Sequence, residues 1–234
     1  MIPLKNLRPR TNFPTVTVAL IVANFMVFFY QLSLSPRALE HFIRTYSVVP
    51  ARVQLALAGS HFTLAQAFLP FFTSMFLHAG WLHIIGNMWF LWLFGGNVED
   101  RLGHFAYLGF YLLCGLGAGV AETVFTLGSN IPSLGASGAI AGVLGAYIVL
   151  FPSSKILTLV TLFFWWFFAR LPAVLFIGLW FLVQFLSGVS SLGSAAQGGV
   201  AWWAHVGGFL LGMLLVSGLR RKQPYDSYDS YNYS

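Results

Sequence analysis

Four polar residues occur in stretches that are otherwise almost wholly apolar: Ser137 in GASG, His205 in AWWAHVGG, and His83 with Asn87 in WLHIIGNMW. Polar side chains of these types are costly inside a lipid bilayer, so each is a candidate for function. A serine hydroxyl becomes a nucleophile when a hydrogen-bonded imidazole removes its proton. Ser137 as nucleophile and His205 as general base therefore predict acyl-transfer chemistry.

His83 and Asn87 are four residues apart, so their side chains share one face of a helix. Their N–H groups suit an oxyanion hole, in which donors meet the negative charge that develops when a serine attacks a carbonyl. The backbone N–H of Ser137, at a predicted helix start, is a third candidate donor. His78 lies five residues before His83 and off that face, so we assign it a supporting role.

These residues must be positioned by membrane-spanning helices. Of the 234 residues, 58% are hydrophobic and only 8% are charged, with a mean hydropathy of +0.77, which lies outside the usual composition of soluble domains. A helix needs about 20 apolar residues to cross a bilayer, and on this basis the chain divides into six spans. The predicted spans are Pro14–Leu32, Leu82–Val98, His104–Leu127, Ala136–Phe151, Leu171–Ser187 and Ala201–Leu219.

The predicted spans place three candidate residues at one depth. The second, fourth and sixth spans run in the same direction; Ser137 and His205 each lie fourteen residues before the end of their span, and His83 lies fifteen before. At 1.5 Å per residue, these side chains are about 20 Å from the same membrane surface. The three residues are therefore expected at one level, a little below the outer surface.

Small residues let two of these helices approach each other closely. Gly138 and Gly142 are four residues apart in the fourth span, as are Gly208 and Gly212 in the sixth. This spacing predicts that the serine reaches the imidazole. The residues to which we assign supporting roles are His78, Gly135, Gly138 and Gly208.

The distribution of charge limits the identity of the base. Nine of the 12 Lys and Arg residues fall on one side of the predicted spans, which orients both termini toward the cytoplasm and explains the pI of about 9.7 without nucleic acid. All lysines and aspartates lie on that side, away from the serine. Glu40 and Glu122 are the acids on the outer side, and neither has a spacing that requires it to orient His205. We expect Glu122 to snorkel toward the surface. A Ser–His dyad is therefore favoured over a triad or a Ser–Lys pair.

An all-α integral membrane protein is the predicted fold class. The segment 33–81 is apolar but broken by prolines, which predicts a helical outer loop half-embedded in the outer leaflet. The stretch KILTLVTLFFWWFFAR, bracketed by Lys155 and Arg170, is interpreted as an interfacial segment on the membrane surface. The predicted domains are a cytoplasmic N-terminal segment (1–13), a six-span domain (14–219) and a polar, disordered cytoplasmic tail (220–234).

Three motifs together carry a resemblance to a known family. HAGWLHIIGN in the second span, GASG at the start of the fourth and AHVGGFLLG in the sixth occur in that order over nearly the whole chain. This pattern resembles the rhomboid intramembrane serine proteases. The resemblance implies a bundle of six transmembrane helices with Ser137 as nucleophile, His205 as general base, and His83 with Asn87 as oxyanion donors.

The resemblance also implies an activity and a location. A rhomboid protease would be a multi-pass protein, of the plasma membrane in a prokaryote, that cleaves single-pass membrane-protein substrates in or near their spans. It would need no metal, cofactor or nucleic acid, and water would reach the dyad through a cavity open to the outside. The fifth span, with its bulky LWFLVQF, is a candidate gate for substrate.

Two departures from the family pattern concern the surroundings of the site. Some members carry an aromatic residue four positions after the nucleophile, stacked on the catalytic histidine, where this chain has Ala141. Members often pair a tryptophan with an arginine in the first outer loop, whereas Arg44 and Arg52 have no tryptophan beside them.

Two other functions fit parts of the pattern. A catalytically inactive rhomboid-like protein would bind membrane segments without cutting them, although such members lose the serine or the histidine, and both are present here. A transporter could use His78, His83 and His205 as a polar path. It would more naturally carry intramembrane carboxylates facing that path and broken helices in matched halves, and the sequence shows neither.

Overall fold

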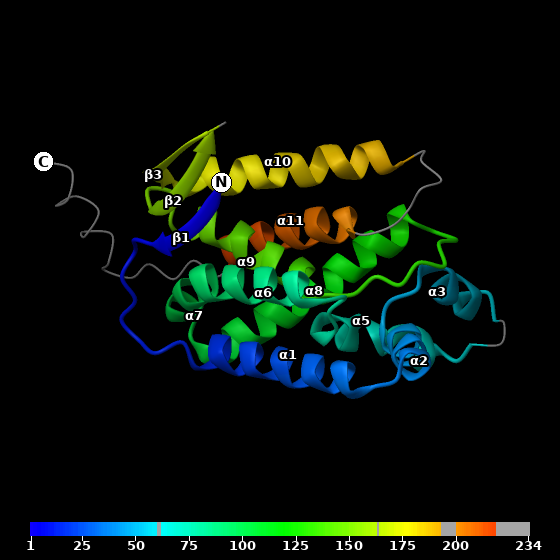
Figure 1. The fold of residues 1–234 in the computed structure, drawn as a ribbon. Coiled ribbons are helices and arrows are strands. Elements are labelled where there is room, and N and C mark those ends of the chain that lie inside the picture. The colour runs from blue at the N-terminus through cyan, green and yellow to red at the C-terminus, as the bar shows by residue number, and fades with distance from the viewer. Residues whose placement is uncertain (60–61, 163, 193–199, 219–234) are drawn as a thin grey trace, which may run out of the picture.

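Apolar helices form most of the protein, and a small antiparallel sheet lies at one end of them (Figure 1). The computed structural model describes residues 1–59, 62–162, 164–192 and 200–218, so the predicted tail, 220–234, lies outside the described residues. In chain order the elements are β1 (Ile2–Asn6), α1 (Thr15–Ser33), α2 (Pro36–Tyr46), α3 (Pro50–Leu57), α4 (Leu64–Phe68), α5 (Pro70–Thr73), η1 (Ser74–Phe76), α6 (Trp81–Phe90), η2 (Leu91–Gly95), α7 (Gly96–Leu102), α8 (His104–Phe125), α9 (Ser137–Leu150), β2 (Lys155–Leu162), β3 (Trp165–Pro172), α10 (Ala173–Ser191) and α11 (Trp202–Gly218).

Helix α9 lies at the centre of the bundle. All of its residues from Gly138 to Tyr147 are buried, as expected for a helix that is apolar on every side. Helix α11 runs along α9 over most of its length, α8 packs against both, and α6 and α10 contact α9 as well. In Figure 1, α10 and α1 lie on opposite sides of this group.

The contact between α9 and α11 is made backbone to backbone. A Cβ atom on Gly208 would overlap the carbonyl oxygen of Gly138, and one on Gly212 would overlap that of Gly142. The predicted glycine pairs therefore face each other across the two helices. Only glycine leaves room for this approach, because any larger side chain at these positions would push the helix axes apart.

Helix α1 is capped by an acid from another part of the chain. The backbone N–H groups of Val16 and Thr17 donate to the two carboxylate oxygens of Glu99, both at 2.8 Å. Those N–H groups belong to the first turn, which has no partner within the helix and carries the positive end of the helix dipole. Asp100 beside it accepts from the backbone N–H of Thr11 at 2.9 Å. These contacts fix the start of α1 against α7.

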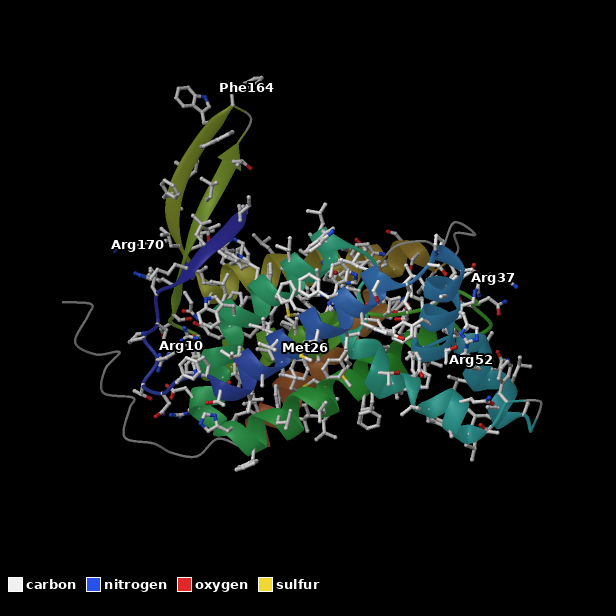
Figure 2. The ribbon with its side chains drawn as sticks, turned by 60° about the horizontal axis from the view of Figure 1, so that its bottom comes forward. Arg10, Met26, Arg37, Arg52, Phe164 and Arg170 are labelled. Carbon is white, nitrogen blue, oxygen red and sulfur yellow. The ribbon has the colours of Figure 1, made fainter. Side chains whose placement is uncertain are left out.

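The segment between α1 and α6 folds into short helices, as the sequence predicts. Ser35 caps α2, with its hydroxyl accepting from the N–H of Ala38 at 3.4 Å, and Thr63 and Gln66 form a capping box at the start of α4. The half-embedded position of this segment stays a prediction. Figure 2 places Arg37 and Arg52 of this segment at one end of the molecule, and Arg10 and Arg170 at the other.

The prediction of an all-α fold is wrong for one segment. The stretch 155–172 forms a β-hairpin, β2 and β3, and β1 pairs with β2 to give the antiparallel order β1-β2-β3. Ile156, Thr158 and Val160 are buried, while the residues between them are more exposed. This alternation with a period of two, and the enrichment in β-branched and aromatic residues, favour a strand over a helix.

The helices include several that suit a membrane by length and composition. Three, Thr15–Ser33, His104–Phe125 and Ala173–Ser191, are long and apolar enough to cross a bilayer; a fourth candidate is the bent pair Leu64–Phe76 with Trp81–Leu102. Helices α9 and α11 are apolar but shorter. The outer face of α1 exposes apolar side chains such as that of Met26, labelled in Figure 2. The protein is therefore a mostly helical membrane protein, and the count of six spans stays a prediction.

The glycine contact generates a stability prediction. Replacing Gly212 by alanine should lower the free energy of unfolding by about 1–3 kcal/mol, the usual cost of overpacking, because the new methyl group meets the backbone of α9. Gly109 in α8 has no atom within 4 Å of its Cβ position, so Gly109→Ala is the matched control and should be neutral or stabilising. Thermal unfolding in detergent measures both. Equal stability of the two variants would contradict the close contact.

Candidate active site

Ser137 is the first residue of α9 and is half-buried. The loop before it is held by the segment between α1 and α6, since the N–H of Gly135 donates to the carbonyl oxygen of Ser74 at 2.9 Å and Val48 forms a β-bridge with Ser133. The serine therefore lies at a fixed helix start, where the first-turn N–H groups are available to a negatively charged oxygen.

His205 lies in the first turn of α11, opposite Ser137. Its Nε2 atom is 2.7 Å from the Ser137 hydroxyl oxygen, and the histidine is 7% exposed. The structure thus brings together the two residues that the sequence places at one depth. The contact crosses the α9–α11 interface next to the first pair of facing glycines, Gly138 and Gly208.

The sequence analysis did not predict Gln184 of α10, which extends the Ser137–His205 contact to a row of three side chains. Its Oε1 atom lies 2.6 Å from Nδ1 of His205, and the side chain is buried. Because an amide oxygen only accepts, Nδ1 carries the proton and Nε2 is left as the acceptor for the serine O–H. A buried glutamine in an apolar span is itself a signal that could have been read from the sequence.

Two tryptophans flank the imidazole, whereas Ala141 does not supply an aromatic ring. The ring of Trp180 from α10 lies 5.8 Å from that of His205 at 36°, and the ring of Trp202 lies 6.4 Å away at 89°. The aromatic packing of His205 therefore comes from α10 and from α11 itself rather than from α9. Like Gln184, Trp180 comes from α10.

His83 of α6 lies against the loop that leads to Ser137. A Cβ atom on Gly135 would lie 2.8 Å from both Cε1 and Nε2 of the His83 ring and 3.6 Å from the serine hydroxyl. Gly135 has a φ angle of +124°, which other residues rarely adopt. The backbone N–H of Ala79 donates to Nδ1 of His83 at 3.4 Å, so Nε2 carries the proton and faces the serine side.

Asn87 lies one turn further along α6 and offers an unused donor. The residue is 8% exposed, and its Nδ2 atom is buried with no hydrogen-bond partner among the described residues. Leaving such a donor unpaired typically costs about 1–3 kcal/mol. Several other buried polar atoms are also unpaired among the described residues, including both ring nitrogens of the neighbouring His78, so the spare donor makes Asn87 a candidate and no more.

His78 supports His83 rather than Ser137. Its ring packs edge-to-face on that of His83 at 5.0 Å. Gln31 of α1 brackets the backbone of His78, accepting from its N–H at 3.0 Å and donating to its carbonyl oxygen at 3.1 Å. Gly138 and Gly208, to which the sequence analysis assigns supporting roles, lie in the α9–α11 contact.

Glu122 does not snorkel to the surface, so that prediction is wrong. The residue is only 9% exposed, and its Oε2 atom accepts from the backbone N–H of Ala204 at 3.0 Å. Because that N–H is in the first turn of α11, the acid fills the role of a cap, as Glu99 does for α1. Ala204 directly precedes His205, so Glu122 stabilises the turn that carries the imidazole.

A cavity of about 740 Å³ lies beside the site. Its lining includes His83, Glu122, Ser133 and Trp202, and it does not include Ser137. The cavity therefore meets the site at His83, and neither Ser137 nor His205 is among its lining residues. In the part of the chain that the structure describes, no three His, Cys, Asp or Glu residues gather in a way that could hold a metal ion.

The fold and the site are those of a membrane protein with a serine–histidine contact between two helices. Residues 65–222, about two thirds of the chain, match the model of the rhomboid domain. The chain therefore belongs to the rhomboid family.

Curated relatives agree with this assignment. Rhomboid-like protein 11, chloroplastic, from Arabidopsis thaliana is 30% identical over 158 residues, covering 64% of this chain and 52% of the relative. RHOMBOID-like protein 1 of the same plant is 28% identical over 223 residues, covering 87% and 52%. Rhomboid protease GluP of Bacillus subtilis (strain 168) is 40% identical over 83 residues, covering 36% and 16%. The chain spans about half the length of the two plant proteins.

The cap on α11 leads to a prediction for Glu122. Replacing it by alanine should remove the acceptor of the Ala204 N–H, at a cost of about 0.5–2 kcal/mol, and speed amide hydrogen exchange at the start of α11. Glu122→Gln keeps an acceptor oxygen and should show a smaller increase. Hydrogen exchange followed by mass spectrometry measures both variants. Unchanged exchange around Trp203–His205 in Glu122→Ala would contradict the capping role.

Proposed function

We propose that this protein is an intramembrane serine endopeptidase that cleaves single-pass membrane proteins in or near their spans. The observation that carries the proposal is the 2.7 Å contact between Ser137 Oγ and His205 Nε2. Membership of the rhomboid family, which includes a relative named a rhomboid protease, supports the same activity.

The proposed reaction is acyl transfer in two halves. Ser137 Oγ attacks the carbonyl carbon of the substrate peptide as its proton passes to His205 Nε2. The tetrahedral intermediate then collapses, the C–N bond breaks, and His205 returns the proton to the leaving amine. Water, deprotonated by the same nitrogen, releases the acyl group and restores the serine.

The donors around the serine would stabilise the developing oxyanion. His83 presents a protonated Nε2 beside Gly135, Asn87 has a spare buried Nδ2 donor, and the Ser137 N–H lies at a helix start. Removing one such donor typically costs about 10²–10³ in kcat. The cavity that reaches His83 would supply the water for deacylation.

Gln184 acts in this mechanism as a positioning residue. By accepting from Nδ1 it fixes the imidazole tautomer and ring orientation, the task that a carboxylate performs in other serine hydrolases. A neutral amide does so without placing a negative charge inside the membrane, where an unpaired carboxylate would be costly.

Substrate would reach the site sideways past α10. This helix exposes Leu179, Leu182 and Leu186, and its inner side meets α11 through the stack of Phe181 on Phe209 at 4.4 Å. The α10–α11 interface is made through side chains, including those of Trp202 and Trp203 against Gly188, so it is easier to separate than the backbone-to-backbone contact of α9 with α11. The proposal includes six spans and cytoplasmic termini, supported by the unequal distribution of Lys and Arg.

Cleavage of a reconstituted substrate tests the proposed function. In liposomes containing a fluorescent single-pass membrane segment, the wild-type protein should release a cleaved fragment. Ser137→Ala and His205→Ala should each lower turnover by about 10⁴-fold or more. Ser133→Ala, which changes another serine in the cavity lining, is the control and should retain activity. Binding without cleavage by the wild type would favour an inactive family member instead.

The role of Gln184 predicts a specific kinetic pattern. Gln184→Met keeps the size of the side chain but removes the acceptor, so kcat should fall by about tenfold, the value of one hydrogen bond, while KM stays unchanged. Gln184→Glu restores an acceptor oxygen and should recover most of the lost rate. If Gln184→Met and Gln184→Glu have the same kcat, or if only KM changes, Gln184 fills space and does not position the imidazole.

A further inference from the structure

The β2–β3 hairpin extends beyond the body of the protein. Strand β1 pairs with β2 only at the base, from Ile156 to Leu159. Beyond that point the hairpin projects sideways past the helices, across their direction, with Phe164 at its tip (Figure 2). Nothing in the catalytic proposal accounts for this projection.

The projecting part is unusually rich in exposed aromatic side chains. Phe164 is 97% exposed, Trp165 and Trp166 are 74% and 75% exposed, and Phe168 is 69% exposed. Neighbouring residues of a strand point to opposite faces, so the two tryptophans present indole rings on both sides of the hairpin. In water such a patch would be an aggregation hazard, and it therefore indicates a surface that contacts something apolar.

The base of the hairpin carries positive charge. Leu157 of β2 is in register with Lys5 of β1 on one side and with Arg170 of β3 on the other. Residues in register share a face of the sheet, so the two exposed cations flank the same leucine. Further toward the tip, the same face continues with Phe168 and Trp166. One face thus changes from cationic at the base to aromatic at the tip.

The backbone of the hairpin limits how deeply it enters a bilayer. Among the described residues, no strand pairs with β2 beyond Leu159 or with the outer edge of β3. Unpaired strand edges are too costly for the hydrocarbon core, whereas water satisfies them in the headgroup region. Tryptophan is the residue that prefers this region, and cations nearby attract anionic lipids. The hairpin also leads directly into α10, since β3 ends at Pro172.

We propose that the hairpin is a membrane-interface anchor. Its aromatic tip, residues 164–168, lies in the headgroup region of the same bilayer that the helices cross, and Lys5 and Arg170 bind anionic headgroups. The partner is the lipid surface itself. Because the anchor is continuous with α10, it holds one end of this helix at the membrane surface.

Spin labels on the 234-residue protein in lipid nanodiscs test this placement. In a Cys114→Ala background, a label at Phe164→Cys should collide with oxygen several-fold more often than with a water-soluble nickel chelate. A label at Pro152→Cys, in the exposed turn at the base, should show the reverse. Thr161→Cys, exposed on β2 and in register with Trp166, provides a second site if the tip variant folds poorly.

Lipid composition separates the two parts of the proposal. Adding phosphatidylglycerol to phosphatidylcholine should increase the protection of the Phe164→Cys label from nickel, and Lys5→Gln with Arg170→Gln should abolish that increase. Free access of nickel to the tip labels would overturn the anchor. Protection from both probes, with label–label broadening that disappears on dilution with unlabelled protein, would assign the surface to a second copy of the chain and also overturn the proposal.

Discussion

The close approach of α9 and α11 is the constraint on which the rest of the structure depends. Facing glycines, Gly138 with Gly208 and Gly142 with Gly212, let the two backbones meet. At the N-terminal ends of the two helices, this contact brings the Ser137 hydroxyl within 2.7 Å of the His205 imidazole. A serine side chain is too short to reach across a helix pair held apart by larger residues. The same small residues that bury α9 thus create the chemical site.

Three buried polar side chains around the bundle are paired with groups from other helices. Gln184 of α10 accepts from the imidazole, Glu122 of α8 caps α11, and Glu99 of α7 caps α1. Each acid accepts backbone N–H groups at the positive end of a helix, so its charge is compensated away from bulk water. Other buried polar atoms, among them Asn87 Nδ2 and both ring nitrogens of His78, have no partner among the described residues, and in the proposed mechanism Asn87 would donate to the oxyanion.

Much of this arrangement could be predicted from the sequence because glycine spacing and span length fix depth and contact. Those features predict that Ser137, His205 and His83 lie at one level. Gln184 and Trp180 were missed because the rotation of α10 about its axis depends on packing, which no periodicity records. Glu122 was misplaced since capping of a distant helix leaves no local pattern. The hairpin was missed because an aromatic, β-branched run of this length also suits an interfacial helix.

Reaction with a fluorophosphonate, followed by mass spectrometric mapping of the adduct, tests the central claim most directly. The account predicts one adduct, on Ser137, that forms in the wild-type protein and is lost in His205→Ala even though the serine remains. An adduct on another residue, or labelling of Ser137 that persists without the imidazole, would contradict the claim that the α9–α11 contact activates this serine.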